Sequence, residues 1–181
     1  MHDDGLAALS LRELARRVGI TTPTVYAYFE SKNAIYDAMF GQAAEEFAEV
    51  MTRPYDTEDP RAVLASGVLR FVEFCTADIP RYQLLFQRMI LNFEPSADSF
   101  TPAVRAFDAL RGRLAANGIT DPRHVDMWTA WTTGLVDQQI SNDPGGDRWS
   151  QLVDDFVDMF LAYFQTAPPL RRSGQTQRRS P

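Results

Sequence analysis

The last third of the chain has the clearest pattern of apolar and polar positions. Apolar residues recur there at intervals of three and four, the period of an amphipathic helix. The pattern predicts two successive helices whose apolar faces are too wide for a single helix contact. Their apolar positions are Val125, Trp128, Trp131, Leu135 and Val136, then Trp149, Leu152, Val153, Phe156, Val157, Phe160, Leu161 and Phe164.

Capping residues divide the beginning of the chain into short helices. The run Ser10-Leu-Arg-Glu13 is a capping box, in which the hydroxyl and the carboxylate satisfy exposed backbone N–H groups. Gly19 ends the helix that this box starts. Thr21 precedes a second short helix, and Ser31 precedes a longer one that runs to about Met51.

Prolines mark the remaining helix boundaries. Asp59-Pro60, Thr101-Pro102 and Asp121-Pro122 each have the cap-then-proline order of a helix start. Ile79-Pro80 breaks one helix and begins another around Tyr82 to Leu91. Strand signals are almost absent, so the sequence predicts about nine helices and no sheet, which is an all-α fold.

Two of the short helices, at about 10–18 and 22–29, have the layout of a helix-turn-helix. In that motif the second helix enters the major groove of DNA. Leu11, Leu14, Ala15 and Val18 form an apolar face, and Ile20 and Val25 are expected to close a small core against it. Thr22, Thr24, Tyr26 and Tyr28 then remain available for bases and phosphates. The alternative is two ordinary packed helices.

The run from Leu9 to Lys32, LSLRELARRVGITTPTVYAYFESK, resembles the signature of the TetR family of regulators. The resemblance implies an all-helical homodimer that binds a palindromic operator and releases it when a small molecule occupies the C-terminal domain. It also implies a helix-turn-helix DNA-binding domain over 1–46 and a larger ligand-binding and dimerisation domain over 47–166. The Pro-, Ser-, Gln- and Arg-rich tail, 167–181, is expected to be disordered.

The resemblance assigns DNA contacts residue by residue within this run. Arg12 matches a position that reaches base edges, where an arginine can contact guanine through two hydrogen bonds. Thr22, Pro23 and Thr24 match the start of the recognition helix. Tyr26 and Tyr28 match aromatic positions that hold phosphates, although Tyr28 also fits a core position, and Lys32 matches a lysine that binds phosphate.

The chain departs from the family pattern at its beginning. The family has a complete helix before the position of Gly5, whereas only four residues precede Gly5 here. The apolar side of Leu6, Leu9, Leu14 and Val18 would then lack a partner. We weigh two explanations: a start codon assigned too late, which we favour, or a natively short chain. In the second case the protein is a dimeric ligand-binding module that has lost DNA binding.

The resemblance also predicts that the last two helices of each protomer pair as a four-helix bundle. A small apolar or amphipathic effector is expected between the helices. The candidate ligand-binding residues are Phe71, Phe74, Tyr82, Phe86, Met89, Phe107 and Trp128, with Cys75 and Phe93 nearby in the pattern. The same residues also fit an ordinary hydrophobic core.

Charge and composition restrict the other possibilities. The net charge is −6, but it is about −1 over residues 1–40, −9 over 41–168 and +4 over 169–181, so a local basic surface near the N-terminus stays possible. One cysteine and two distant histidines give no metal-ligand or catalytic pattern. We therefore expect no enzyme activity, no cofactor, no metal, no membrane span and a cytoplasmic location.

Overall fold

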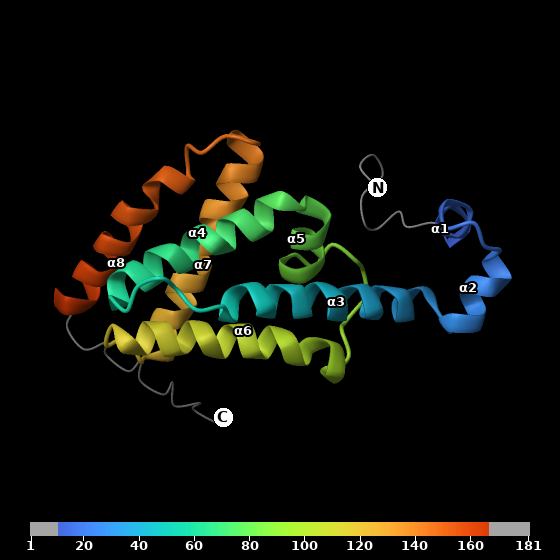
Figure 1. The fold of residues 1–181 in the computed structure, drawn as a ribbon, viewed down its shortest axis with the longest axis horizontal. Helices are drawn as coiled ribbons and strands as arrows, with labels where there is room; N and C mark the ends of the chain where they lie inside the picture. Colours follow the sequence, from blue (N-terminus) through green and yellow to red (C-terminus); the bar gives the residue numbers. More distant parts are fainter. Residues whose placement is uncertain (1–10, 167–181) are drawn as a thin grey trace, which may run out of the picture.

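The computed structural model describes residues 11–166, and these form eight α-helices, one short 3₁₀-helix and no strand (Figure 1). The all-α prediction is confirmed over this range. Ser10, residues 1–9 and the predicted disordered tail lie outside the described residues. The helices are α1 (Leu11–Arg17), α2 (Thr22–Tyr28), α3 (Lys32–Thr52), α4 (Pro60–Ala77), α5 (Ile79–Phe86), α6 (Ala97–Ala116), α7 (Pro122–Asn142), η2 (Ser150–Leu152) and α8 (Val153–Thr166).

The capping side chains explain most of these boundaries. Thr21, Ser31, Asp59, Asp78 and Asp121 each accept a hydrogen bond from a backbone amide in the first turn of the helix that follows. Such a bond satisfies one of the amides that a helix start leaves without an intrahelical partner. The predicted starts of five helices are thereby confirmed.

Two predicted boundaries are wrong. The fifth helix ends at Phe86 rather than at Leu91, because the chain leaves helical geometry at Gln87. The sixth begins at Ala97, where the Ser96 hydroxyl accepts from the Ser99 amide at 3.2 Å, and not at Thr101-Pro102. Pro102 lies inside the helix, one turn beyond its start.

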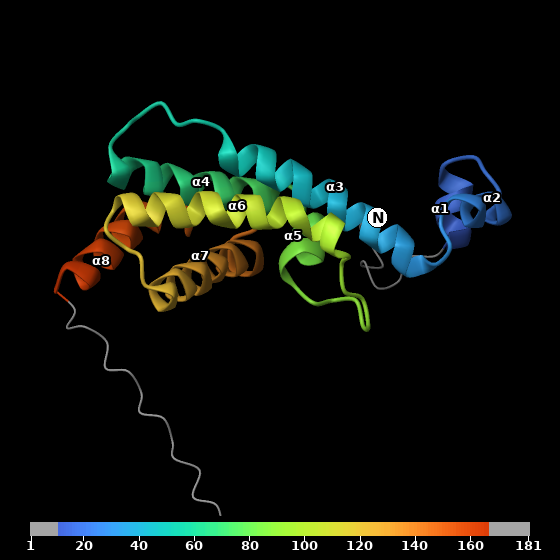
Figure 2. The ribbon, with the colours of Figure 1, turned by 90° about the horizontal axis from the view of Figure 1, so that it is seen from below.

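The long helix α3 organises the molecule. It runs from the body of the protein to α1 and α2, which lie at its far end, and α6 packs beside it (Figures 1 and 2). The main core lies among α4, α7 and α8. Its aromatic centre is Trp128 on α7 with Phe156 and Phe160 on α8, at ring-centroid distances of 5.1 and 4.9 Å.

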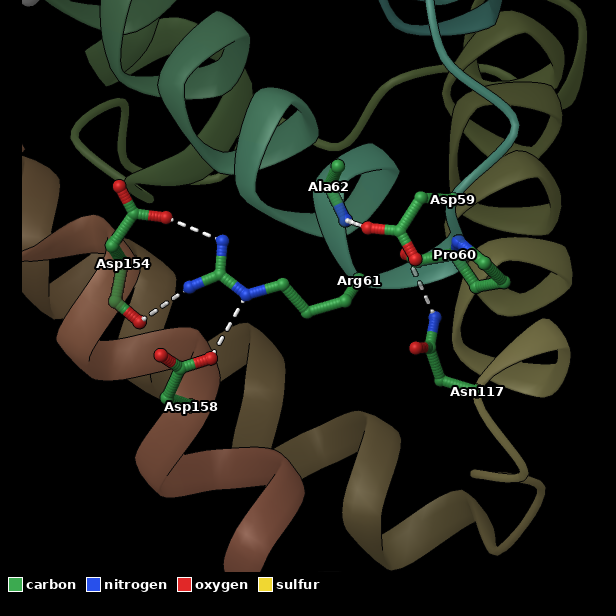
Figure 3. A network of polar contacts seen from close by, with 7 residues as sticks. All are labelled: Asp59, Pro60, Arg61, Ala62, Asn117, Asp154 and Asp158. Atoms are coloured by element: carbon green, nitrogen blue, oxygen red, sulfur yellow. Dashed lines mark hydrogen bonds and ion pairs between the residues drawn. The ribbon is translucent and has the colours of Figure 1, made fainter.

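A polar network fixes α4 to two neighbouring helices (Figure 3). Arg61 donates to Asp154 at 2.5 Å and to Asp158 at 2.8 Å, and thus ties the first turn of α4 to α8. This ion pair lowers the pKa of Asp158. Asn117, at the end of α6, donates to the Pro60 carbonyl oxygen at 3.0 Å.

The turn between α7 and α8 is held by one buried amide side chain. Gln139 donates to the carbonyl oxygen of Gly146 at 3.1 Å and accepts from the backbone amide of Trp149 at 3.0 Å. These bonds fix where α8 starts. Within the described residues no helix is long and apolar enough to cross a membrane.

Candidate DNA-reading helices and ligand cavity

The turn between α1 and α2 depends on a glycine. Gly19 has φ of +73°, a conformation that L side chains rarely adopt. The Ile20 amide donates to the Ala15 carbonyl oxygen at 3.0 Å and the Gly19 amide to that of Arg16 at 3.3 Å. This pair of bonds closes the C-terminus of α1 and turns the chain into α2.

A small core joins both helices to α3. Ala15, Val25 and Ile35 are buried, and Phe29 and Met39 pack against them. Two expected members are absent from this core: Val18 is 58% exposed and Ile20 is 41% exposed. The prediction that Val18 belongs to this core and that Ile20 helps to close it is therefore wrong, whereas Val25 closes it as predicted, together with Ile35 and Met39 of α3. Leu6 and Leu9, and the side chains of Leu11 and Leu14, lie outside the described residues.

The predicted DNA-contacting residues lie together at this end of the molecule. Arg12, Pro23 and Tyr26 are exposed, and Tyr28 is 78% exposed, which excludes it from the core. Thr22 and Thr24 are half-buried, and the hydroxyl of Thr24 shares a hydrogen bond of 2.8 Å with that of Thr21. Half-buried Lys32 begins α3, with its Nζ 5.5 Å from the centre of the Tyr36 ring. All seven residues are thus on α1, α2 or the first residue of α3.

A second cluster on α1 pairs charges with one another. Glu13 accepts from Arg16 at 2.6 Å and from Arg17 at 3.0 Å. These hydrogen bonds hold the pKa of Glu13 at about 2, so its carboxylate stays charged at neutral pH. Glu13 therefore offsets part of the positive charge of α1.

A cavity of about 480 Å³ lies among α3, α4, α5, α6 and α7, within the range of about 300–1,000 Å³ of small-molecule sites. Four of the predicted ligand-binding residues line it, namely Phe71, Phe86, Phe107 and Trp128. Further lining residues escaped the sequence reasoning because they fit an ordinary core or a surface. They are Phe40, Phe47, Met51, Leu64, Gly67, Val68, Leu85, Phe100, Ala103, Val104, Ala106, Leu110, Arg113, Thr129, Thr132 and Thr133.

The other three predicted ligand-binding residues are not among those that line this cavity. Phe74 stacks beneath the Arg81 guanidinium, whose Cζ is 3.9 Å from the ring centre. Tyr82 is fully buried and donates its hydroxyl to Asp137 at 2.7 Å. Met89 is 50% exposed, in the segment after α5. The helical spacing of Phe100, Val104 and Phe107 is the signal that would have pointed to the α6 wall.

Aromatic rings connect the cavity to the first turns of α3. Phe40 and Phe100 line the cavity with stacked rings whose centroids are 6.1 Å apart. Phe93 lies 6.5 Å from Phe40 and 5.7 Å from Tyr36, whose ring faces Lys32. Neighbouring rings thus extend from the cavity wall to the residue that begins α3.

Asp37 fixes the start of α6 to the same part of α3. It accepts from the Ser96 amide at 2.6 Å and from the hydroxyls of Ser96 and Ser99, both at 2.9 Å. These bonds stabilise the carboxylate and lower the pKa of Asp37 below its ordinary value of 3.8.

We predict that Asp37→Asn lowers the free energy of unfolding by about 1–2 kcal/mol at pH 7, because hydrogen bonds to a charged group are lost. A group with a lowered folded-state pKa stabilises the protein above its unfolded-state pKa, and the contribution disappears as the pH falls through the folded-state pKa. Urea unfolding from pH 7 to pH 3 measures the difference between Asp37→Asn and the unmodified chain. The exposed Asp126→Asn on α7 is the control. A difference that stays constant over this range would contradict the prediction.

Comparisons with known proteins agree with this architecture. The family described as "Bacterial regulatory proteins, tetR family" matches residues 1–39. The tetracycline repressor protein class C of Escherichia coli is 31% identical over 171 residues, which cover 92% of this chain and 74% of that protein. The HTH-type transcriptional activator FasR of Mycolicibacterium smegmatis is 29% identical over 156 residues, covering 78% of this chain and 70% of that protein.

A solved structure supports the same fold. The TetR family transcriptional regulator PfmR from Thermus thermophilus superimposes with a TM-score of 0.62 at 18% identity, over 86% of this chain and 88% of that chain. The sequence match to the Escherichia coli repressor extends through both the paired short helices and the helical body. The chain belongs to the TetR family of bacterial transcription regulators.

Proposed function

We propose that this protein is a ligand-responsive repressor that binds a palindromic operator as a homodimer in the cytoplasm. The observation that carries the proposal is the position of α3. Its first turns complete the core of the helix-turn-helix through Ile35, and its later turns line the cavity through Phe47 and Met51. A molecule that changes the packing of the cavity therefore acts on α3, the helix to which the helix-turn-helix of α1 and α2 is attached.

The proposed dimer forms through α7 and α8. Most of their predicted apolar stripe faces inward, since Trp128, Phe156 and Phe160 are buried in the main core. Apolar side chains nevertheless remain exposed on these helices and the turn before α8: Trp131, Leu152, Met159 and Tyr163. Paired with the same face of a second copy, as isologous symmetry requires, they would be removed from water.

DNA binding is tested by fluorescence anisotropy of the full chain with labelled DNA from its own promoter region, at two salt concentrations. We predict that Arg12→Ala weakens binding by about 1–3 kcal/mol and relaxes sequence selectivity, because a base contact is lost. Lys32→Ala should weaken binding to all sequences and reduce the dependence on salt, because a phosphate contact is lost. Arg123→Ala, exposed on α7, is the matched control and should bind as the unmodified chain does.

The result also decides between the two functions considered for this chain. If a folded dimer shows no selective binding, or if Arg12→Ala leaves selectivity unchanged, the DNA-reading assignment is wrong. The first outcome would favour the ligand-binding module without DNA binding. The exposure of Val18 and Ile20 next to the reader is the observation that makes this alternative worth testing.

A further inference from the structure

Most of the cavity wall is apolar, and its polar lining residues are one arginine and the three threonines Thr129, Thr132 and Thr133 of α7. The arginine is Arg113 on α6, and its Nη1 donates to the Met51 carbonyl oxygen at 2.7 Å. Its Nη2 is buried and has no hydrogen-bond partner. A buried donor without a partner costs free energy, and a charged one costs more than a neutral one.

A second unpartnered donor lies beside it. The Tyr55 hydroxyl is buried and also lacks a hydrogen-bond partner, and the Tyr55 ring centre is 5.6 Å from Cζ of Arg113. Gly67, which also lines the cavity, shows how close the two groups are. A Cβ built on Gly67 would lie 3.3 Å from the Tyr55 oxygen and 3.8 Å from Nε of Arg113.

The positive charge of Arg113 has no ion-pair partner within the described part of the chain. Arg70 stacks on the Tyr55 ring as well, with its Cζ 4.0 Å from the ring centre. Among residues 11–166 no carboxylate forms an ion pair with Arg70 or Arg113. Burial lowers the pKa of Arg113, with a smaller contribution from the charge of Arg70, and the neighbouring Tyr55 hydroxyl opposes this shift. An arginine nevertheless stays protonated in proteins.

Helix capping accounts for only some of the donors of Arg70, Arg113 and Tyr55. Arg70 donates to the carbonyl oxygens of Val50, Arg53 and Pro54, and Arg113 to that of Met51, so both stabilise the C-terminal end of α3. This role uses Nη1 of Arg113. It leaves Nη2 without a well-formed hydrogen bond, although the neighbouring Tyr55 oxygen stabilises the Arg113 charge. The Tyr55 hydroxyl proton, on a residue next to the cavity-lining Gly67 but not itself in the cavity wall, has no acceptor among the described residues.

We propose that the cavity binds an amphipathic carboxylate, whose anionic group pairs with Arg113 and Tyr55 and whose apolar body packs against the aromatic wall of α3, α4 and α6. The proposal rests on the ligand-responsive function above and names the chemical class of its effector. A carboxylate accepts two hydrogen bonds and compensates the buried charge, which an uncharged apolar molecule cannot do.

The test compares ligands that differ only in the head group. Decanoate, dodecanoate and tetradecanoate are titrated into the full chain by calorimetry, below their micellar concentrations, against the straight-chain alcohols of equal length. We expect each carboxylate to bind about tenfold to hundredfold more tightly than its alcohol, because a charge-assisted contact is gained. Equal affinities for acid and alcohol would overturn the proposal.

Two variants locate the head group. Arg113→Met keeps the apolar stem and should abolish the preference for the acid while leaving the affinity for the alcohol unchanged. Arg111→Met, on the same helix but exposed and paired with Asp108, should keep the preference. A preference that survives in Arg113→Met would overturn the assignment. If Arg113→Met does not fold, the ligand series on the unmodified chain still decides.

Operator binding is measured in the same titrations, so the two proposals can fail separately. Release of the operator by the alcohols as readily as by the acids would support the ligand-responsive function and overturn the carboxylate assignment. Tight binding of the acids with unchanged operator affinity would support the carboxylate site and contradict the ligand response, because coupling between two binding sites is reciprocal.

Discussion

Met159→Asp is expected to convert the proposed dimer into a monomer and to reduce operator affinity by about 10²–10⁴-fold, the gain that linking two binding modules provides. Met159 is 57% exposed on α8, next to the other exposed apolar side chains of the proposed dimer face. In a symmetric dimer the substitution introduces two carboxylates into one apolar contact, and each would lose its hydration. Each monomer then presents one recognition helix to one half-site. Light scattering measures the mass, and anisotropy measures operator affinity.

The control for this prediction is Leu69→Asp on α4, which also places a charge at an exposed apolar position but on a helix that does not form the proposed dimer face. It should leave both the mass and the operator affinity unchanged. A dimeric Met159→Asp protein would show that the dimer forms elsewhere. A monomeric variant with undiminished operator affinity would show instead that DNA is bound by single chains.

Phe160→Ala is expected to lower the free energy of unfolding by about 3–5 kcal/mol, the cost of removing a large buried aromatic side chain. Phe160 is fully buried, and its ring contacts those of Trp128, Trp131, Phe156 and Phe164 at centroid distances from 4.4 to 6.0 Å. These large rings fill the space between α7 and α8, which the backbone cannot close after truncation. Urea unfolding at one protein concentration measures the change, since dimer stability depends on concentration.

Leu69→Ala provides the comparison for this loss, because Leu69 is 46% exposed and its truncation leaves no cavity. Its effect should stay within about 0.5 kcal/mol, as at most surface positions. A loss below about 1 kcal/mol in Phe160→Ala would mean that α8 is not held by this core and that its inward face is available for the dimer.

Much of the fold could be predicted because local chemistry fixes it. The side chains of Thr21, Ser31 and Asp59 satisfy backbone amides within three residues, so their effect is visible in the sequence. Gly19 is similar, since its positive φ belongs to the turn itself. The positions of the paired helices followed from these signals together with the family resemblance.

The errors arose where distant residues decide the structure. Thr101-Pro102 has a local start signal, but Ser96 and the contact with Asp37 on α3 place the helix start earlier. Val18 and Ile20 have the right spacing for a core, yet both are exposed, and the core includes Ile35 of α3 instead. The partners of Phe74 and Tyr82, namely Arg81 and Asp137, also come from tertiary packing, as does the burial of Arg113 at the cavity.

The unbroken course of α3 has a mechanical consequence. The helix has 21 residues and no proline, so it transmits a tilt from one end to the other as a rigid rod about 30 Å long. A rotation of about 5° about its C-terminal end would displace the far end by about 2.6 Å, close to the length of a hydrogen bond. In a two-fold dimer both α3 helices tilt symmetrically, so the distance between the two recognition helices changes by about twice this displacement. That distance has to match the spacing of two successive major grooves. Small side-chain movements in the cavity wall would then suffice to displace both recognition helices from the major grooves.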